Sequence, residues 1–292
     1  MQYKTTRSFF CFVVILISCA ADCSAVMLRK TNAAPGNAEP EIVHFPSGSV
    51  TLGGLVYKPN GAGPFRALLY NHGSAPGMLN NQAFAVLGPL FVRHGWVFFA
   101  PYRRGQGLSQ SAGEYVGSQI AAAEKKGGVA AGAATMIRLL RTSQLDDQLA
   151  ALRWLKKQPY VRLNSIGVAG NSFGGIETIL GAEHAHFCAA VDASGAAQSW
   201  SEAPALQTLL IEAVQHSNAP ILFFQAENDY DLAPSRVLSK AMNDAGKISV
   251  VKIYPRYATW AGEGHSFAYR GSAVWGDDVF RFLNRYCPAP SN

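Results

Sequence analysis

The most constraining feature of this sequence is a series of short apolar runs that alternate with helix-like segments. Most runs are bounded by Gly or Pro and are apolar at consecutive positions, so both faces of the corresponding strand would be buried. Strands of this kind belong to a mostly parallel sheet with helices on both faces. We therefore predict an α/β fold with about eight strands. The expected strands are 42–45, 50–57, 65–71, 97–100, 165–169, 189–193, 220–225 and 249–254.

Helices are expected between these strands, and one region breaks the regular alternation. Leucines recur at helical spacing in 145–157, which stops before Pro159, and a last helix is expected at 273–286. Residues 110–144 are rich in Ala, Gly and Ser and carry a break at 125–128. An insertion at this point would lie near the carboxyl ends of the strands, where ligands of open parallel sheets bind. We expect either a lid over the site or a surface loop with two short helices and no role in the reaction.

The N-terminus has the features of an export signal. Lys4 and Arg7 precede an apolar run at 9–17, and small residues follow it. This pattern predicts a signal peptide over residues 1–25. The run is short for a transmembrane helix, which takes about 20 apolar residues.

Two processing sites compete in this leader. Residues 16–19 resemble a bacterial lipobox, which would leave a lipidated Cys19 and anchor the protein to a membrane through its acyl chains. Ordinary cleavage at the small residues 23–25 is the alternative. Both predict an exported protein, which would be periplasmic, extracellular or lipid-anchored. Residues 26–41 have the composition of a flexible tether, and the folded domain is predicted over 42–287.

Composition and charge exclude two classes of protein. With 49% apolar and 15% charged residues, the chain is not a disordered protein. Removal of residues 1–18, which include Lys4 and Arg7, would lower the excess of basic over acidic residues from six to four. The sequence contains no basic run or basic helix face, so no nucleic-acid partner is expected.

Two cysteines remain in the predicted domain, Cys188 and Cys287. Both would lie at the end of the sheet opposite the carboxyl ends of the strands. We prefer two separate buried thiols, and a disulfide formed in an oxidising compartment is the alternative. The spacing of Cys and His residues does not indicate a metal site, and we expect neither a metal nor another cofactor.

Residues 170–175, Gly-Asn-Ser-Phe-Gly-Gly, contain the motif G-x-S-x-G. The motif lies directly between a predicted strand and an apolar, helix-like segment at 176–182. In that context it describes a sharp turn that lifts the serine above the sheet, and the flanking positions leave little room for side chains. Ser172 is therefore the predicted nucleophile.

A serine hydroxyl needs a base to take its proton and an acid to orient that base. His265 follows the last predicted strand in a Gly-rich segment, which we expect to be a loop, and it is the predicted base. Asp229 follows the strand at 220–225 and is the predicted acid, with Asp231 and then Glu227 as alternatives. The order serine, acid, histidine is that of the α/β-hydrolase fold.

Further site residues follow two other strands. The backbone N–H groups of Ser74 and Phe173 are predicted to form an oxyanion hole, in which each donor contributes roughly 3–4 kcal/mol to the transition state. The side chain of His72 is expected to be structural. Arg103 and Arg104 are candidates to bind an acidic group of the substrate, although we prefer the interpretation that they brace neighbouring loops through carboxylates.

Taken together, these segments resemble the dienelactone hydrolase family and the related catalytic domain of the prolyl oligopeptidase group. The likeness extends over about residues 50–285. It rests on HGS at 72–74, YRRGQGLS at 102–109, DDQLAALRWL at 146–155, GNSFGG at 170–175, AENDYDLAPS at 226–235 and GHSFAYRGS at 264–272. The resemblance implies an α/β-hydrolase fold, cleavage of esters, lactones or similar acyl bonds without a cofactor, and an acid at Asp229.

The chain departs from these relatives in two ways. The dienelactone hydrolases that name the family use a cysteine nucleophile, whereas this chain has Ser172. The peptidase relatives carry an additional propeller domain, for which this chain has no room.

The predicted function is hydrolysis of carboxylic esters or lactones by a Ser-His-Asp triad through an acyl-enzyme. The expected partner is a small-molecule acyl substrate. A serine peptidase or amidase that acts on small acylated peptides is one alternative. A surface protein that kept the fold but only binds its ligand is another.

Overall fold

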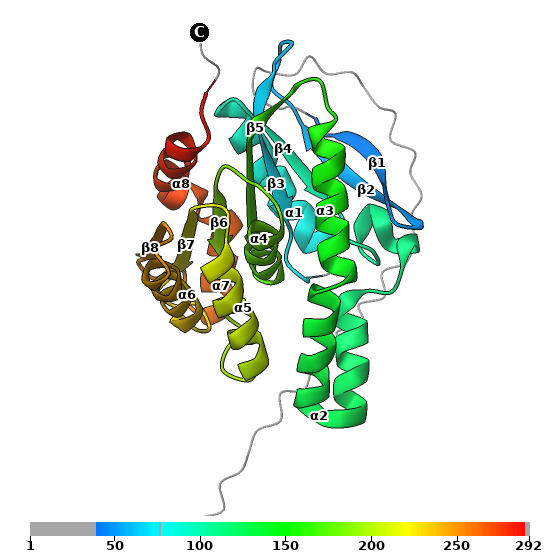
Figure 1. Cartoon of the computed structure of the whole chain (residues 1–292), viewed down its shortest axis with the longest axis vertical. Coiled ribbons are helices and arrows are strands. Elements are labelled where there is room, and N and C mark those ends of the chain that lie inside the picture. The colour runs from blue at the N-terminus through cyan, green and yellow to red at the C-terminus, as the bar shows by residue number, and fades with distance from the viewer. Residues whose placement is uncertain (1–38, 76, 290–292) are drawn as a thin grey trace, which may run out of the picture. The chain divides into compact units, whose positions relative to one another are not determined.

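One sheet runs through the part of the chain that the computed structural model describes, residues 39–75 and 77–289 (Figure 1). Its strands are β1 (Glu41–Ser47), β2 (Val50–Tyr57), β3 (Phe65–Asn71), β4 (Trp96–Pro101), β5 (Val161–Asn171), β6 (Ala190–Ala193), β7 (Ile221–Ala226) and β8 (Ser249–Tyr254). They lie in the order β1-β2-β4-β3-β5-β6-β7-β8. β2 is antiparallel to both β1 and β4, and the other pairings are parallel. The prediction of a mostly parallel sheet of eight strands is confirmed.

Helices cover both faces of the sheet. They are α1 (Gly77–Arg93), α2 (Val116–Leu140), α3 (Ser143–Lys156), α4 (Phe173–His184), α5 (Pro204–His216), α6 (Ala233–Asp244), α7 (Ala261–Arg270) and α8 (Ser272–Tyr286), with a 3-10 turn η1 (Gly107–Ala112). Ile179 of α4 and Leu210 of α5 belong to the core on one face. Phe84 of α1, Phe267 of α7 and Phe280 of α8 belong to the core on the other. Because β3 to β8 run in the same direction, their carboxyl ends meet at one edge of the sheet.

Most of the N-terminal predictions lie outside the described residues. These are the signal peptide, the lipobox at Cys19 and nearly all of the tether at 26–41. The first strand begins at Glu41, the last position assigned to the tether. Among the described helices, none is long and apolar enough to cross a membrane.

The predicted insertion at 110–144 contains the end of η1 and a helical hairpin, α2. α2 is interrupted at Gly128, whose φ of 76° reverses the chain at the predicted break. Figure 1 shows the two arms of α2 side by side. A Cβ at Gly132 on the second arm would lie 3.2 Å from Cβ of Glu124 on the first, so the arms are closely packed. α2 also contacts α3 and α5, which attach the hairpin to the domain.

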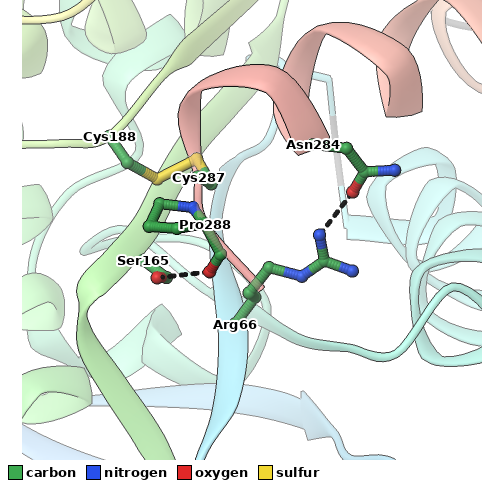
Figure 2. The surroundings of a disulfide bond; sticks show 6 residues. All are labelled: Arg66, Ser165, Cys188, Asn284, Cys287 and Pro288. Carbon is green, nitrogen blue, oxygen red and sulfur yellow. Dashed lines mark hydrogen bonds between the residues drawn. A yellow bond between two sulfur atoms is a disulfide. The ribbon is translucent and has the colours of Figure 1, made fainter. Parts of the chain in front are cut away.

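Cys188 and Cys287 form a disulfide, so the preferred interpretation of two separate thiols is wrong (Figure 2). Cys188 lies just before β6, and Cys287 follows α8. The bond therefore ties the last helix to the centre of the sheet, at the edge away from the carboxyl ends of the strands. Beside it, the Ser165 hydroxyl donates a hydrogen bond of 2.9 Å to the carbonyl oxygen of Pro288.

Replacing both cysteines with alanine is expected to lower the free energy of unfolding by about 2–4 kcal/mol, because the bond closes a long loop and restricts the unfolded chain. The separation between the two cysteines is 99 residues. Urea unfolding of the oxidised protein and of the double variant measures the difference. Hydrolytic activity should change little, since the bond lies at the opposite edge of the sheet. Equal urea midpoints for the two proteins would contradict the prediction.

Candidate active site

Ser172 lies at the turn from β5 into α4, as the motif predicts. Its backbone angles, φ 56° and ψ −122°, are unfavourable for a residue with a side chain, and such strain costs on the order of 1–3 kcal/mol. A Cβ at Gly174 would overlap the backbone carbonyl of Asn71 at the end of β3. Glycine at this position therefore lets the helix approach the neighbouring strand. The turn has the sharp, strained geometry that presents a serine at the carboxyl edge of a sheet.

Asp229 and His265 contact each other directly. Nδ1 of His265 lies 2.8 Å from Oδ1 of Asp229. Asp229 lies in the turn after β7, and His265 lies within α7. The expectation that His265 sits on a loop is therefore wrong. Gly264, the residue before it, lies in the same helix. A Cβ at this position would overlap the backbone of Asn228, so glycine lets the helix approach the turn that carries Asp229.

Further hydrogen bonds hold the Asp229 carboxylate. Gln225 Nε2 donates to Oδ2 at 2.8 Å, and the backbone N–H of Tyr230 donates to Oδ1 at 2.8 Å. Burial alone would raise the pKa of Asp229. The hydrogen bonds from His265, Ser194 and Gln225 outweigh it, so the pKa is lowered. Asp229 therefore stays ionised and can accept the Nδ1 proton of His265, which leaves Nε2 of the neutral ring free of a proton.

The two alternative candidates for the acid, Asp231 and Glu227, do not share the hydrogen bond that Asp229 makes to His265. Oδ1 of Asp231 accepts the backbone N–H of Ala233 at 2.8 Å, at the start of α6. Glu227 is exposed. The contact with His265 thus favours Asp229 over both.

The end of β6 connects the nucleophile turn to the acid–base pair. The backbone N–H of Ser172 donates to the carbonyl oxygen of Ala193 at 3.0 Å. The next residue, Ser194, bonds Asp229 through its side chain. Sequence reasoning missed both Ser194 and Gln225, although each is a polar residue at the carboxyl end of an apolar strand, and that signal could have identified them.

The predicted oxyanion donors line one cavity together with Ser172. Ser74 and Phe173 both belong to its wall. The N–H of Phe173 is the first of α4, so it has no acceptor within the helix and carries the positive end of the helix dipole. The carbonyl of Ser74 accepts a hydrogen bond from the Tyr115 hydroxyl, which holds that loop in place.

Both arginines are engaged by the protein itself. Arg103 is buried and pairs with Glu177, and it also donates to the carbonyl oxygens of His72 and Gly73. Arg104 makes two side-chain hydrogen bonds to Asp147, of 2.6 and 2.9 Å. These contacts support the interpretation that the arginines brace neighbouring segments through carboxylates. Arg103 does so through Glu177 of α4, and Arg104 does so through Asp147 of α3.

Replacing Glu177 with glutamine is expected to destabilise the protein by about 3 kcal/mol or more, because the buried Arg103 cation loses its counter-charge. Thermal or urea unfolding measures this loss. Glu183→Gln on the same helix is the matched control, since the Glu183 carboxylate pairs with His184 near the surface and, within residues 39–75 and 77–289, with no other cation. Equal stability of the two variants would count against the bracing role.

His72 is a structural residue, as expected. It is buried, and its ring packs against Phe84 and Tyr102. Burial, followed by the nearby Arg103 cation, lowers the pKa of His72 well below its usual range. The ring is therefore neutral, and it supports the loop that carries Ser74.

Comparison with known proteins agrees with this architecture. An esterase from Pyrococcus furiosus superposes with a TM-score of 0.62 at 15% identity, over 88% of this chain and 94% of the other. An acylaminoacyl peptidase from Pyrococcus horikoshii superposes with a TM-score of 0.61 at 17% identity, over 87% of this chain and 43% of the other. For dipeptidyl peptidase 4 from Porphyromonas gingivalis, the TM-score is 0.60 and the identity 18%, over 86% of this chain and 36% of the other. The chain thus spans less than half the length of these peptidases. No curated protein matches the sequence.

The sheet order, the helical layers and the turn at Ser172 define a hydrolase with the α/β-hydrolase fold. The sequence profile of the Dienelactone hydrolase family matches residues 77–280. The chain belongs to this family.

Proposed function

We propose that the protein is a serine hydrolase that cleaves carboxylic esters or lactones through an acyl-enzyme. The observation that carries the proposal is the hydrogen bond between Asp229 and His265, at the same edge of the sheet as the strained turn that holds Ser172. Nε2 of His265 is buried and has no hydrogen-bond partner among the described residues. A base nitrogen in this state is available to a serine hydroxyl or to a leaving group.

The proposed reaction has two stages. In the first, Ser172 Oγ attacks the carbonyl carbon and His265 Nε2 takes its proton, while the N–H groups of Phe173 and Ser74 hold the oxyanion. The bond to the leaving oxygen then breaks, and His265 gives that oxygen the proton. In the second stage, water attacks the acyl-enzyme, His265 takes the proton of the water, and the proton returns to Ser172 as the acid leaves. Asp229 stabilises the imidazolium in both stages.

A fluorophosphonate probe tests the enzyme class. We expect the probe to label the wild type and to leave Ser172→Ala unlabelled. Unlabelled, correctly folded wild-type protein would reject the proposal. A panel of p-nitrophenyl esters and aminoacyl anilides then separates an esterase from a peptidase, and we expect faster turnover of the esters.

We also propose that the protein is exported. The basic and apolar pattern of residues 1–25 supports this, and so does the disulfide, since such bonds persist in oxidising compartments. The intact mass of the mature protein tests the proposal and separates a lipidated Cys19 from cleavage at 23–25. A mature chain that begins at Met1 would reject export by a cleaved signal.

A further inference from the structure

Two adjoining cavities lie between the α2 hairpin and the segment that links β6 to α5. The first, of about 120 Å³, contains Ser172 and the loop residue Ser74 in its wall. The second, of about 140 Å³, extends along the second arm of the hairpin past Ala133 to Val129. Both cavities are lined by Ile120 and Met136 of α2 and by Gln198 and Ser199 of the facing segment. The four shared residues place the second cavity directly beside the first.

The first cavity has a mainly apolar wall of Phe173, Ile176, two alanines and the hairpin residues Ile120 and Met136, with serines and Gln198 beside them. The second cavity is mixed: its wall has apolar residues of the hairpin, the polar Gln198 and Ser199, and two exposed carboxylates, Glu124 and Glu202. In the farther cavity, Val129 is half-exposed although its side chain is apolar. An apolar ligand there would bury this surface, which is favourable.

The position of the cavities decides which part of a substrate they receive. The leaving group must lie beside His265, because this residue gives it a proton. His265 is not among the residues that line either cavity. Ser172 and both proposed oxyanion donors do line the first. The cavities therefore extend from the acyl side of the bond that is cut.

The volumes indicate the size of the acyl group. A cavity of about 150 Å³ lined with Leu, Ile and Phe side chains takes up benzene. Each of the two cavities is of comparable size, so each has room for a group of about six carbon atoms. Acetyl and other short acyl groups would leave the second cavity empty.

We propose that the α2 hairpin forms an acyl-binding channel, and that the substrates are esters with an extended apolar acyl chain of roughly ten carbons. The chain passes between Ile120 and Met136 and ends beside Val129. This inference rests on the proposed ester hydrolysis at Ser172 and names the class of substrate. The insertion is then a specificity element and not only a cover.

A series of p-nitrophenyl esters from acetate to dodecanoate tests the channel. We expect kcat/KM of the wild type to rise by about tenfold or more from acetate to decanoate, because each added methylene is buried. Ala133→Phe fills the second cavity and should lower kcat/KM for decanoate by about tenfold, with acetate changed less than about twofold. Ala134→Phe is the matched control, since Ala134 is exposed on the same arm. It should leave both esters unchanged.

Equal decanoate activity in Ala133→Phe and Ala134→Phe would overturn the channel, as would a wild-type rate that does not rise with acyl length. If Ala133→Phe does not fold, Met136→Ala replaces it: this variant enlarges both cavities, and the preferred ester should shift to a longer chain. An unchanged preference overturns the proposal. These failures leave acetate turnover and fluorophosphonate labelling intact, whereas failure of the proposed function abolishes both.

Discussion

Replacing Ser172 with alanine is expected to lower kcat by about five to six orders of magnitude, the loss seen when a triad nucleophile is removed. The methyl group cannot form the acyl-enzyme, and only the oxyanion donors and substrate binding remain. Initial rates on a p-nitrophenyl ester at saturating substrate measure the effect. KM should change little, because the hydroxyl does not hold the ground-state substrate.

Ser165→Ala is the matched control for this experiment. Ser165 is buried and lies on β5, the strand that leads to Ser172, and its hydroxyl bonds the carbonyl of Pro288 near the disulfide. It should keep nearly full activity. A Ser172→Ala variant that retains more than about 1% of the wild-type kcat would reject Ser172 as the nucleophile.

Replacing Asp229 with asparagine is expected to lower kcat by about four orders of magnitude. The amide is uncharged, so it neither fixes the Nδ1 tautomer of His265 nor stabilises the imidazolium. The single amide oxygen can keep the hydrogen bond from the backbone N–H of Tyr230 and loses the one from Gln225, so the fold should survive with a modest loss of stability. Circular dichroism and thermal unfolding check that it does.

Asp231→Asn provides the comparison, because Asp231 accepts the N–H of Ala233 and does not contact His265. Its asparagine oxygen can accept the same hydrogen bond, so activity should fall less than about tenfold. Similar losses in the two variants would leave the acid unassigned between these positions.

Much of the sheet could be read from local pattern. The strands predicted at 50–57, 65–71 and 249–254 have the same limits in the structure. β5 is longer than predicted at its start, because Val161 pairs with Phe65 across a register shift. The polar residues Arg162 and Asn164 conceal this extension. Pairing with a distant strand, rather than local hydropathy, decides where β5 begins.

The surroundings of His265 were harder to predict. Two glycines near this residue indicate a loop by local rules. The segment is nevertheless helical, because Phe267 and Ala268 pack into the core beside α8. The free energy gained from tertiary packing outweighs the cost of glycine in a helix, which is about 1 kcal/mol per residue relative to alanine.

The sequence by itself determined the alternation of strands and helices and the serine turn, because each depends on residues close together in the chain. Tertiary structure alone decided the carboxylate partners of the arginines and the pairing of Cys188 with Cys287. Arg103 and Glu177 are 74 positions apart, and the two cysteines are 99 apart. A buried charge requires a counter-charge nearby, because leaving it unpaired is strongly destabilising. Sequence spacing carries no information on which residue supplies that counter-charge.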